Sequence, residues 1–306
     1  MTSTPTSAQP GGAVPDLRAA TVTRAPAPRR RRARPTSRSI ALLVVGVVIA
    51  VVYLLPFYVA VVNSFKTDQD ASLHPLALPG TWTTAAFESL FQRSDFGVWA
   101  MNSVIVAVFV TLGRIFFDSL AGYALARLRF RGRQAVFAAL VAVMAVPGVV
   151  LLIPKFLVIN QLGMYDSYSG MIVPLLVDAA GVFIMKNFFE SIPVSVEEQA
   201  KIDGAGTFRT FWSIVLPMAR PAVVTITILS FQGSWNELAH FIVSSSSPGL
   251  TTLTKGVASL ASGGLSAGNQ FPIKLAAAFV MTIPVAVAFF VFQKRIMNSS
   301  EGAVKE

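Results

Sequence analysis

Residues 40–62 form a run of 23 residues without a charged side chain. An α-helix rises about 1.5 Å per residue, so the run would extend roughly 35 Å, and the hydrocarbon core of a bilayer is about 30 Å thick. A secretory signal peptide is the competing interpretation, but its apolar region usually spans only ~7–15 residues, and no convincing Ala-x-Ala cleavage site follows. We therefore expect a first transmembrane helix here.

The composition agrees with an integral membrane protein. Hydrophobic residues make up 54% of the chain and charged residues 13%, against about 25% charged in soluble domains. The net charge of +10 fits either a nucleic-acid partner or basic loops beside a membrane, and the mean hydropathy of +0.63 favours the second. The 306 residues leave no room for a nucleotide-binding domain beside five to eight spans of about 20 residues. Zero cysteines exclude disulfides, thiolate metal sites and cysteine nucleophiles.

Further apolar segments predict five more membrane helices, at 99–126, 135–159, 169–190, 219–243 and 274–294. The fold class is then all-α, a polytopic membrane protein with six transmembrane helices. We expect a membrane domain at 40–298, preceded by a disordered, arginine-rich tail at 1–39 and followed by a short tail at 299–306.

The positive charges indicate the topology. The arginine-rich tail, the 127–134 loop, the 187–218 loop and the C-terminal tail hold most lysines and arginines, and they fall on alternate sides from the poorly charged 63–98, 160–168 and 244–273 loops. Because basic loops stay in the cytoplasm, we expect a multi-pass protein of the cell membrane with both termini cytoplasmic. The arginine tail then contacts anionic lipid and needs no nucleic-acid partner.

The loop at 191–221 carries structure of its own. Ser195 and Glu198 have capping-box spacing, which predicts a helix of about two turns starting after Pro193. Asp203-Gly204 would stop it, since glycine adopts the left-handed conformation of a helix end. A second short helix is expected from Thr207 to Leu216, ending at Pro217. The first helix would expose Glu197, Glu198 and Lys201, either as part of a plain surface loop or as a docking element.

The same loop resembles the EAA loop of the permease subunits of ABC importers. That pattern is E-A-A, three residues, G, nine residues, I, one residue, L-P, and it is matched by Glu198-Gln199-Ala200, Gly204, Ile214 and Leu216-Pro217, with Gln199 in place of the usual alanine. Segments similar to the sugar-type subgroup, and to the smaller membrane subunit of maltose-type importers, are 102–106, 121–132, 147–148, 152–154, 188–193, 233–238 and 302–305. The resemblance covers roughly residues 40 to 306.

The resemblance implies the type I importer permease fold and a non-catalytic permease subunit. It implies a second permease subunit, two ATPase subunits and an external solute-binding protein as partners, with ATP and magnesium bound by the ATPase subunits and no cofactor in this chain. The residues expected to couple to the ATPase are Glu197, Glu198, Ala200, Lys201, Asp203 and Gly204. The cargo would be a sugar, with a di- or oligosaccharide favoured. Glycerol-phosphate, amino acids and polyamines stay open as cargo, and a membrane-embedded enzyme is the alternative of another class.

Ionisable residues inside the predicted spans are candidate functional groups, because charges at membrane depth are costly. Arg114 and Asp118 are four residues apart, which predicts an internal ion pair. Polar groups that interrupt transmembrane helices often mark a substrate site, so we expect a substrate pathway near Asp178, Trp235, Asn236 and Glu237. Lys155, near the end of its span, is expected to reach the membrane interface. The two histidines, His74 and His240, lack partners at ligand spacing, so no metal site is predicted.

Overall fold

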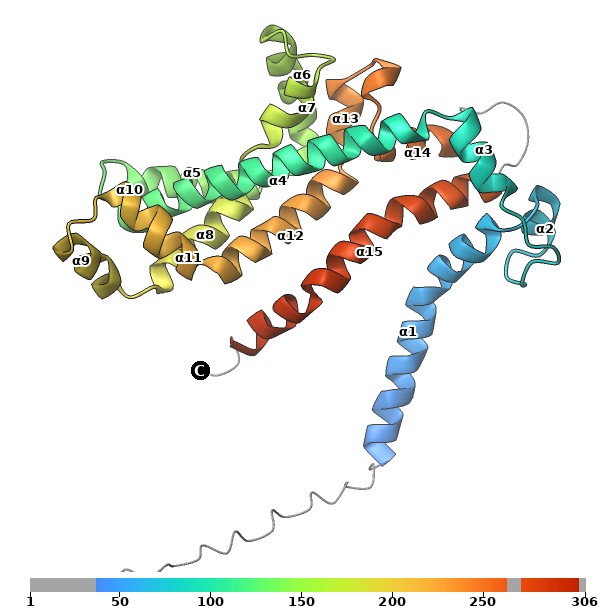
Figure 1. Cartoon of the computed structure of the whole chain (residues 1–306), viewed down its shortest axis with the longest axis horizontal. Helices are drawn as coiled ribbons and strands as arrows, with labels where there is room; N and C mark the ends of the chain where they lie inside the picture. The colour runs from blue at the N-terminus through green and yellow to red at the C-terminus, as the bar shows by residue number, and fades with distance from the viewer. Residues whose placement is uncertain (1–36, 263–270, 303–306) are drawn as a thin grey trace, which may run out of the picture. The chain divides into compact units, whose positions relative to one another are not determined.

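The computed structural model describes residues 37–262 and 271–302 (Figure 1). Contacts divide the chain into one unit at Met1–Val51 and a second at Val52–Glu306. Of the first unit, the structure describes the N-terminal part of helix α1, and the helices after α1 all belong to the second unit. Residues 1–36 of the predicted arginine-rich tail and residues 303–306 of the predicted C-terminal tail lie outside the described residues.

Every described element is a helix, which confirms the predicted all-α class. The α-helices are α1 (Ser37–Ser64), α2 (Asp68–Leu73), α3 (Ala85–Arg93), α4 (Phe96–Arg127), α5 (Arg133–Met144), α6 (Leu152–Gln161), α7 (Tyr168–Ile172), α8 (Ala179–Ser191), α9 (Val194–Ile202), α10 (Thr207–Thr210), α11 (Leu216–Met218), α12 (Arg220–Asn236), α13 (Ala239–Ser244), α14 (Leu253–Ala261) and α15 (Phe271–Gly302). Three 3₁₀ turns, η1 (Gly148–Leu151), η2 (Val173–Leu175) and η4 (Pro248–Leu250), and one π-helical turn, η3 (Phe211–Val215), join them.

Four stretches among the described residues are long and apolar enough to cross a membrane, namely Ile40–Ser64, Phe96–Arg127, Tyr168–Ser191 and Phe271–Gln293. Two bent helix pairs bring the number to six if each pair is one span. Each of the six predicted spans overlaps one of these stretches or pairs. Helix α15 continues past the predicted end at 294 to Gly302.

The predicted span at 135–159 is not one straight helix. α5 ends at Met144, and the η1–α6 segment leaves it at an angle of 104°. Pro147 causes the break, because proline has no amide hydrogen and its ring disfavours helical backbone at the residue before it. Pro147 itself has ψ 127°, outside the helical range.

Two other predicted spans are also interrupted. The span at 169–190 breaks before α8, where Asp178 has extended backbone, with φ −127° and ψ 127°. The span at 219–243 ends its main helix at Asn236, and α13 starts separately at Ala239 after the extended Glu237. At its other end α12 makes an angle of 79° with the Thr207–Met218 helix.

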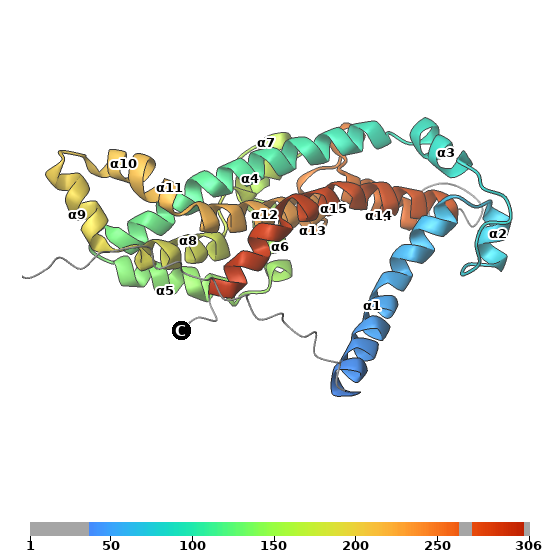
Figure 2. The ribbon, with the colours of Figure 1, turned by 60° about the horizontal axis from the view of Figure 1, so that its bottom comes forward.

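Helices α8 and α12 pack along α4 and form the body of the second unit (Figures 1 and 2). Close approach of α4 and α8 depends on Gly122, because a Cβ there would lie 2.7 Å from the Cβ of Met185. The buried cluster at this contact includes Tyr123, Phe189 and Phe211. Near the other end of α4, the ring of Trp99 covers Gly256 of α14. At both contacts the absence of a Cβ lets the facing side chain, Met185 or Trp99, lie directly on the glycine backbone without a gap.

Candidate functional site

Helix α9 is the short helix expected in the 191–221 loop, but it starts differently from the prediction. It begins at Val194 with Pro193 as its N-cap, and no side chain caps it. Ser195 is the second helical residue, so it already has helical backbone and is not in position to act as an N-cap. The predicted capping box of Ser195 and Glu198 is therefore wrong.

The C-terminal end of α9 confirms the predicted stop. Gly204 has φ +78°, the left-handed conformation that costs least for glycine. The amide of Ala205 donates to the carbonyl of Ala200 at 2.9 Å, and the amide of Gly204 donates to that of Lys201 at 3.0 Å. This pair of hydrogen bonds is the Schellman motif, and it gives α9 a firm end.

The base of α9 is fixed to α4 by an ion pair. Nε of Arg127 lies 3.0 Å from Oε1 of Glu197, at an orientation outside hydrogen-bond geometry, and both side chains are less than a tenth exposed. The hydroxyl of Tyr123 donates to Oε2 of Glu197 at 3.4 Å, and Arg127 also donates to the carbonyls of Phe189 and Ile192. Glu197 is thus buried, and the expectation that it is exposed is wrong, because the helix turns this side chain toward Arg127.

The outer face of α9 carries Glu198, Lys201, Asp203 and Gly204, all exposed, whereas Ala200 is buried against the chain itself. Ile202 is 79% exposed on the same helix, and Phe208 on α10 is 71% exposed. The sequence reasoning missed these two residues. The signal for them was a pair of large apolar side chains in an otherwise polar loop, one on each side of the turn at 203–206.

The segment after α9 continues further than predicted. The helix starts at Thr207, as predicted, passes through the π-helical turn η3 and ends at Met218, one residue past the predicted end at Pro217. Pro217 lies in α11, directly after the π-helical turn η3 and one residue before the end of this helix. Phe211 of η3 anchors this segment, with its ring centroid 5.0 Å from that of Tyr123.

The predicted ion pair between Arg114 and Asp118 does not form. Nε of Arg114 donates to the carbonyl of Leu175 at 2.8 Å, and Oδ1 of Asp118 accepts from the amide of Asp178 at 3.0 Å. Both side chains hydrogen-bond backbone groups that have no helical partner where the chain breaks before α8. Such hydrogen bonds are needed because an unsatisfied backbone group inside a membrane is costly. Asp178 itself caps α8 by accepting from the amide of Gly181 at 3.2 Å.

The residues predicted for the substrate pathway lie at helix ends. Trp235 is buried and donates from Nε1 to the carbonyl of Met281 at 3.1 Å. Glu237 accepts at Oε1 from the amide of His240 at 2.9 Å, and Asn236 is exposed at the end of α12. These three are consecutive and lie together, whereas Asp178 lies at the start of α8. No group of three metal-ligating side chains occurs among the described residues.

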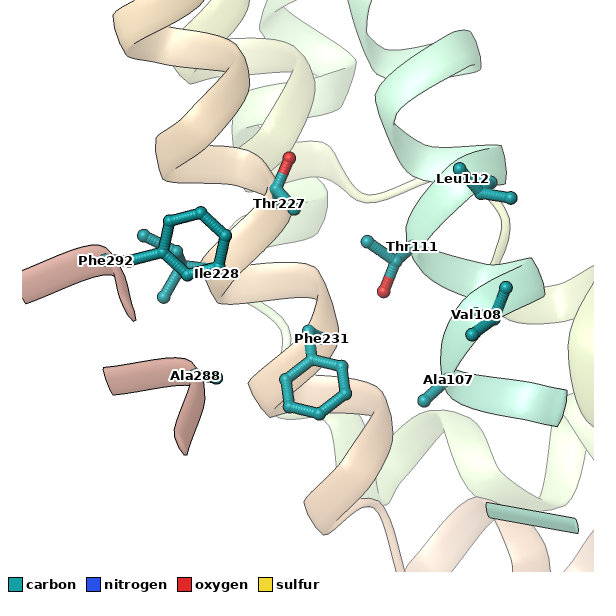
Figure 3. Close-up of a pocket in the computed structure, with 9 residues that line it drawn as sticks. All are labelled: Ala107, Val108, Thr111, Leu112, Thr227, Ile228, Phe231, Ala288 and Phe292. Atoms are coloured by element: carbon teal, nitrogen blue, oxygen red, sulfur yellow. The ribbon is translucent and has the colours of Figure 1, made fainter. Parts of the chain in front are cut away.

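A cavity of about 290 Å³ lies between α4, α12 and α15 (Figure 3). Its lining is apolar except for two threonines, and consists of Ala107, Val108, Thr111, Leu112, Thr227, Ile228, Phe231, Ala288 and Phe292. Thr227 uses its hydroxyl within α12, donating to the carbonyl of Val223 at 2.6 Å. The cavity therefore offers hydrocarbon surface, and none of the predicted substrate residues lines it.

These features define a polytopic membrane protein that presents the short, firmly anchored helix α9 outside its spans. The pattern of the family described as binding-protein-dependent transport system inner membrane component matches residues 118–298, and the chain belongs to this family. It is therefore a non-catalytic, multi-pass membrane permease component of an ABC importer, which works with an ATPase and a binding protein.

Relatives cover most of the chain. It is 30% identical to the diacetylchitobiose uptake system permease protein NgcG of Streptomyces coelicolor, over 84% of this chain and 85% of that protein. It is 29% identical to the arabinooligosaccharides transport system permease protein AraQ of Bacillus subtilis, over 87% and 95%. It is 30% identical to the sn-glycerol-3-phosphate transport system permease protein UgpE of Yersinia pestis, over 83% and 91%.

A solved structure shares the fold. A chain from the crystal structure of a bacterial ABC transporter involved in the import of the acidic polysaccharide alginate matches with a TM-score of 0.76 and 24% identity, over 84% of this chain and 95% of that chain. The predicted family and importer permease fold are thus confirmed.

Proposed function

We propose that this chain is one of two permease subunits of a sugar importer and forms half of the pathway for a di- or oligosaccharide. Two ATPase subunits bind ATP and magnesium, and this chain holds no cofactor. The proposal of a di- or oligosaccharide as cargo is supported by two relatives, which are named as permeases for diacetylchitobiose and for arabinooligosaccharides.

The observation that carries the coupling role is the anchoring of α9. A helix of this length is marginal alone, but the buried Arg127–Glu197 pair and the hydrogen bonds at Gly204 hold it at both ends. Movement of an ATPase subunit against α9 would therefore displace α4 and α8 as well. We assign ATPase contact to the exposed Glu198, Lys201, Asp203 and Gly204.

The other two predicted coupling residues have a different place in this proposal. Glu197 and Ala200 face the chain itself and hold α9 in position. Charged groups on the exposed face then contribute orientation and encounter rate with the partner more than raw affinity. Coupling requires that the ATPase and the loaded binding protein favour the same conformation of the pathway.

We also propose that Asn236 contacts cargo, because its amide is exposed where α12 ends and amides hydrogen-bond sugar hydroxyls. Trp235, Glu237 and Asp178 belong to the same proposed pathway. Their present hydrogen bonds hold the ends of α12, α13 and α8, so they would shape the pathway around Asn236.

Substitution of Gly204 tests the coupling role. Gly204→Val places a β-branched residue at φ +78°, which disfavours the end of α9 by roughly 1–2 kcal/mol. We expect loss of uptake and of substrate-stimulated ATP hydrolysis, with normal membrane insertion. The matched control is Gly206→Val, two residues away, with φ −70° and open space around it. Normal uptake by Gly204→Val would contradict the docking role.

Glycerol-phosphate is the second candidate cargo, because UgpE is as similar to this chain as NgcG is. Calorimetry on the solute-binding protein of this importer separates the two candidates. We expect heat of binding with diacetylchitobiose or arabinooligosaccharides and none with sn-glycerol 3-phosphate. The reverse pattern would replace the sugar by the phosphate ester.

A further inference from the structure

A polar cavity of about 660 Å³ lies where α4 ends, α5 begins and α9 packs against them. Its lining has four cationic side chains and two carboxylates, from Arg127, Arg129, Arg133, Lys201, Glu197 and Glu198. The remaining lining residues are Ala126, Leu128 and Val194. The cavity thus combines basic groups from the α4–α5 loop with both acidic and basic groups of α9.

Part of this charge is already paired. Glu197 is bound to Arg127, and Arg133 lies 3.4 Å from Oε1 of Glu190. Within the described part of the chain, Arg129 and Lys201 have no carboxylate at ion-pair distance. Glu198 is the one lining carboxylate left unpaired there, so two unpaired cations face one unpaired anion. A bound anion would neutralise the remaining positive charge of the lining.

The loop between α4 and α5 indicates the kind of anion. It joins the end of one apolar span to the start of the next, so it lies at the membrane boundary. Exposed apolar and basic side chains alternate along it, as Leu128, Arg129, Phe130 and Arg131. Such alternation suits the interface, where apolar side chains enter the acyl boundary and arginines reach lipid phosphates. A small soluble anion would make no use of Leu128 and Phe130.

We propose that this cavity binds the phosphate of an anionic phospholipid headgroup, with Arg129, the unpaired arginine of its lining, as the ligand. The apolar Leu128 and Phe130 hold the adjoining acyl region. The site adds a lipid ligand to the permease and does not depend on the cargo.

Native mass spectrometry of the assembled importer tests the site. The complex is placed in nanodiscs with equal amounts of phosphatidylcholine and phosphatidylglycerol, and the retained lipids are counted. We expect phosphatidylglycerol to be enriched among the retained lipids. In Arg129→Gln the ratio of retained phosphatidylglycerol to phosphatidylcholine should be about fivefold lower, because one arginine near an anionic surface contributes about 1 kcal/mol. Arg209→Gln is the matched control, because it removes an exposed charge on α10 outside this cavity.

Two results would overturn the proposal. One is an unchanged lipid ratio in Arg129→Gln, and the other is an equal loss in Arg209→Gln, which would reflect general surface charge. A second variant, Phe130→Ser, changes an exposed side chain outside the packed body and should also lower retention of phosphatidylglycerol.

The source of the anion is tested separately. Displacement of phosphatidylglycerol by millimolar inorganic phosphate would identify a site for a soluble anion and overturn the lipid assignment. Lipid retention that appears only when the ATPase subunits are removed would assign the cavity to the ATPase and overturn it as well. The lipid count involves no transport, so it fails or succeeds independently of the coupling role tested at Gly204.

Discussion

At the scale of single residues, Asp166 links the loop between α6 and α7 to the segment that follows α13. Its carboxylate accepts from the hydroxyl of Ser247 and from the amides of Ser247 and Ser246, the two amides at 2.9 and 2.8 Å. These hydrogen bonds, led by that of the Ser247 hydroxyl, lower the pKa of Asp166 to about 2. The link is formed by the ionised carboxylate, because the charged form is the better acceptor.

This lowered pKa predicts a pH dependence. Since the folded pKa lies below the ordinary value near 3.9, the stabilisation is complete above about pH 4 and is lost as the pH falls toward 2. We expect Asp166→Asn to speed hydrogen exchange at Ser246 and Ser247 at pH 7, while the wild type keeps its protection, corrected for intrinsic rates, from pH 7 to pH 5. Asp95→Asn is the control, because Asp95 caps α4 without a side-chain hydrogen bond. Equal exchange in Asp166→Asn and wild type would contradict the prediction.

A second residue-scale prediction concerns Gly181 in α8. A Cβ at this position would lie 2.1 Å from Oδ2 of Asp118, and Asp118 is held by the amide of Asp178. We expect Gly181→Ala to destabilise the protein by about 1–3 kcal/mol, because the crowded contact is buried. Thermal unfolding in detergent measures this, and Gly97→Ala in open space on α4 should be neutral or slightly stabilising. Equal melting temperatures for the two variants would show that the contact relaxes freely.

At the scale of elements, α9 depends on a partner helix for its position. Glu197→Gln removes the negative charge opposite the buried Arg127 and leaves that cation unpaired, a loss of about 3–5 kcal/mol for a buried pair. We expect faster proteolysis after Lys201 and weaker coupling of ATP hydrolysis to substrate.

The matched control for this element is Glu198→Gln. It makes the same charge change on the next residue, which is exposed, so its rate of proteolysis should equal that of the wild type. If Glu197→Gln is cut no faster than Glu198→Gln, the ion pair does not hold α9.

At the scale of the whole molecule, the charge distribution predicts which loops share a side of the membrane. The chain has no cysteine, so single introduced thiols report topology without background. We expect an impermeant maleimide to label Gln92→Cys in α3 on intact cells and Gly206→Cys beside α9 only after permeabilisation. Labelling of Gly206→Cys on intact cells would reverse the proposed orientation.

Much of the candidate site follows from local sequence. The stop of α9 at Gly204 is predictable because a left-handed residue strongly favours glycine, whatever surrounds it. The capping box failed because Pro193 is the N-cap and Val194 the first helical residue, so Ser195 stands two residues past the N-cap position that a capping box needs. Burial of Glu197 was not predictable, since its partner Arg127 is 70 positions earlier in the chain.

The sequence by itself determined the class of fold, the positions of the apolar stretches and the family, because hydropathy over about 20 residues and motif spacing are local properties. Only the tertiary structure decided which polar side chains pair, as with Arg114 and Asp118, whose partners lie at the break before α8. It also decided the breaks within the spans and the two faces of α9. The physical reason is that buried polar groups in a membrane take whichever partner the packing of distant segments brings within hydrogen-bond reach.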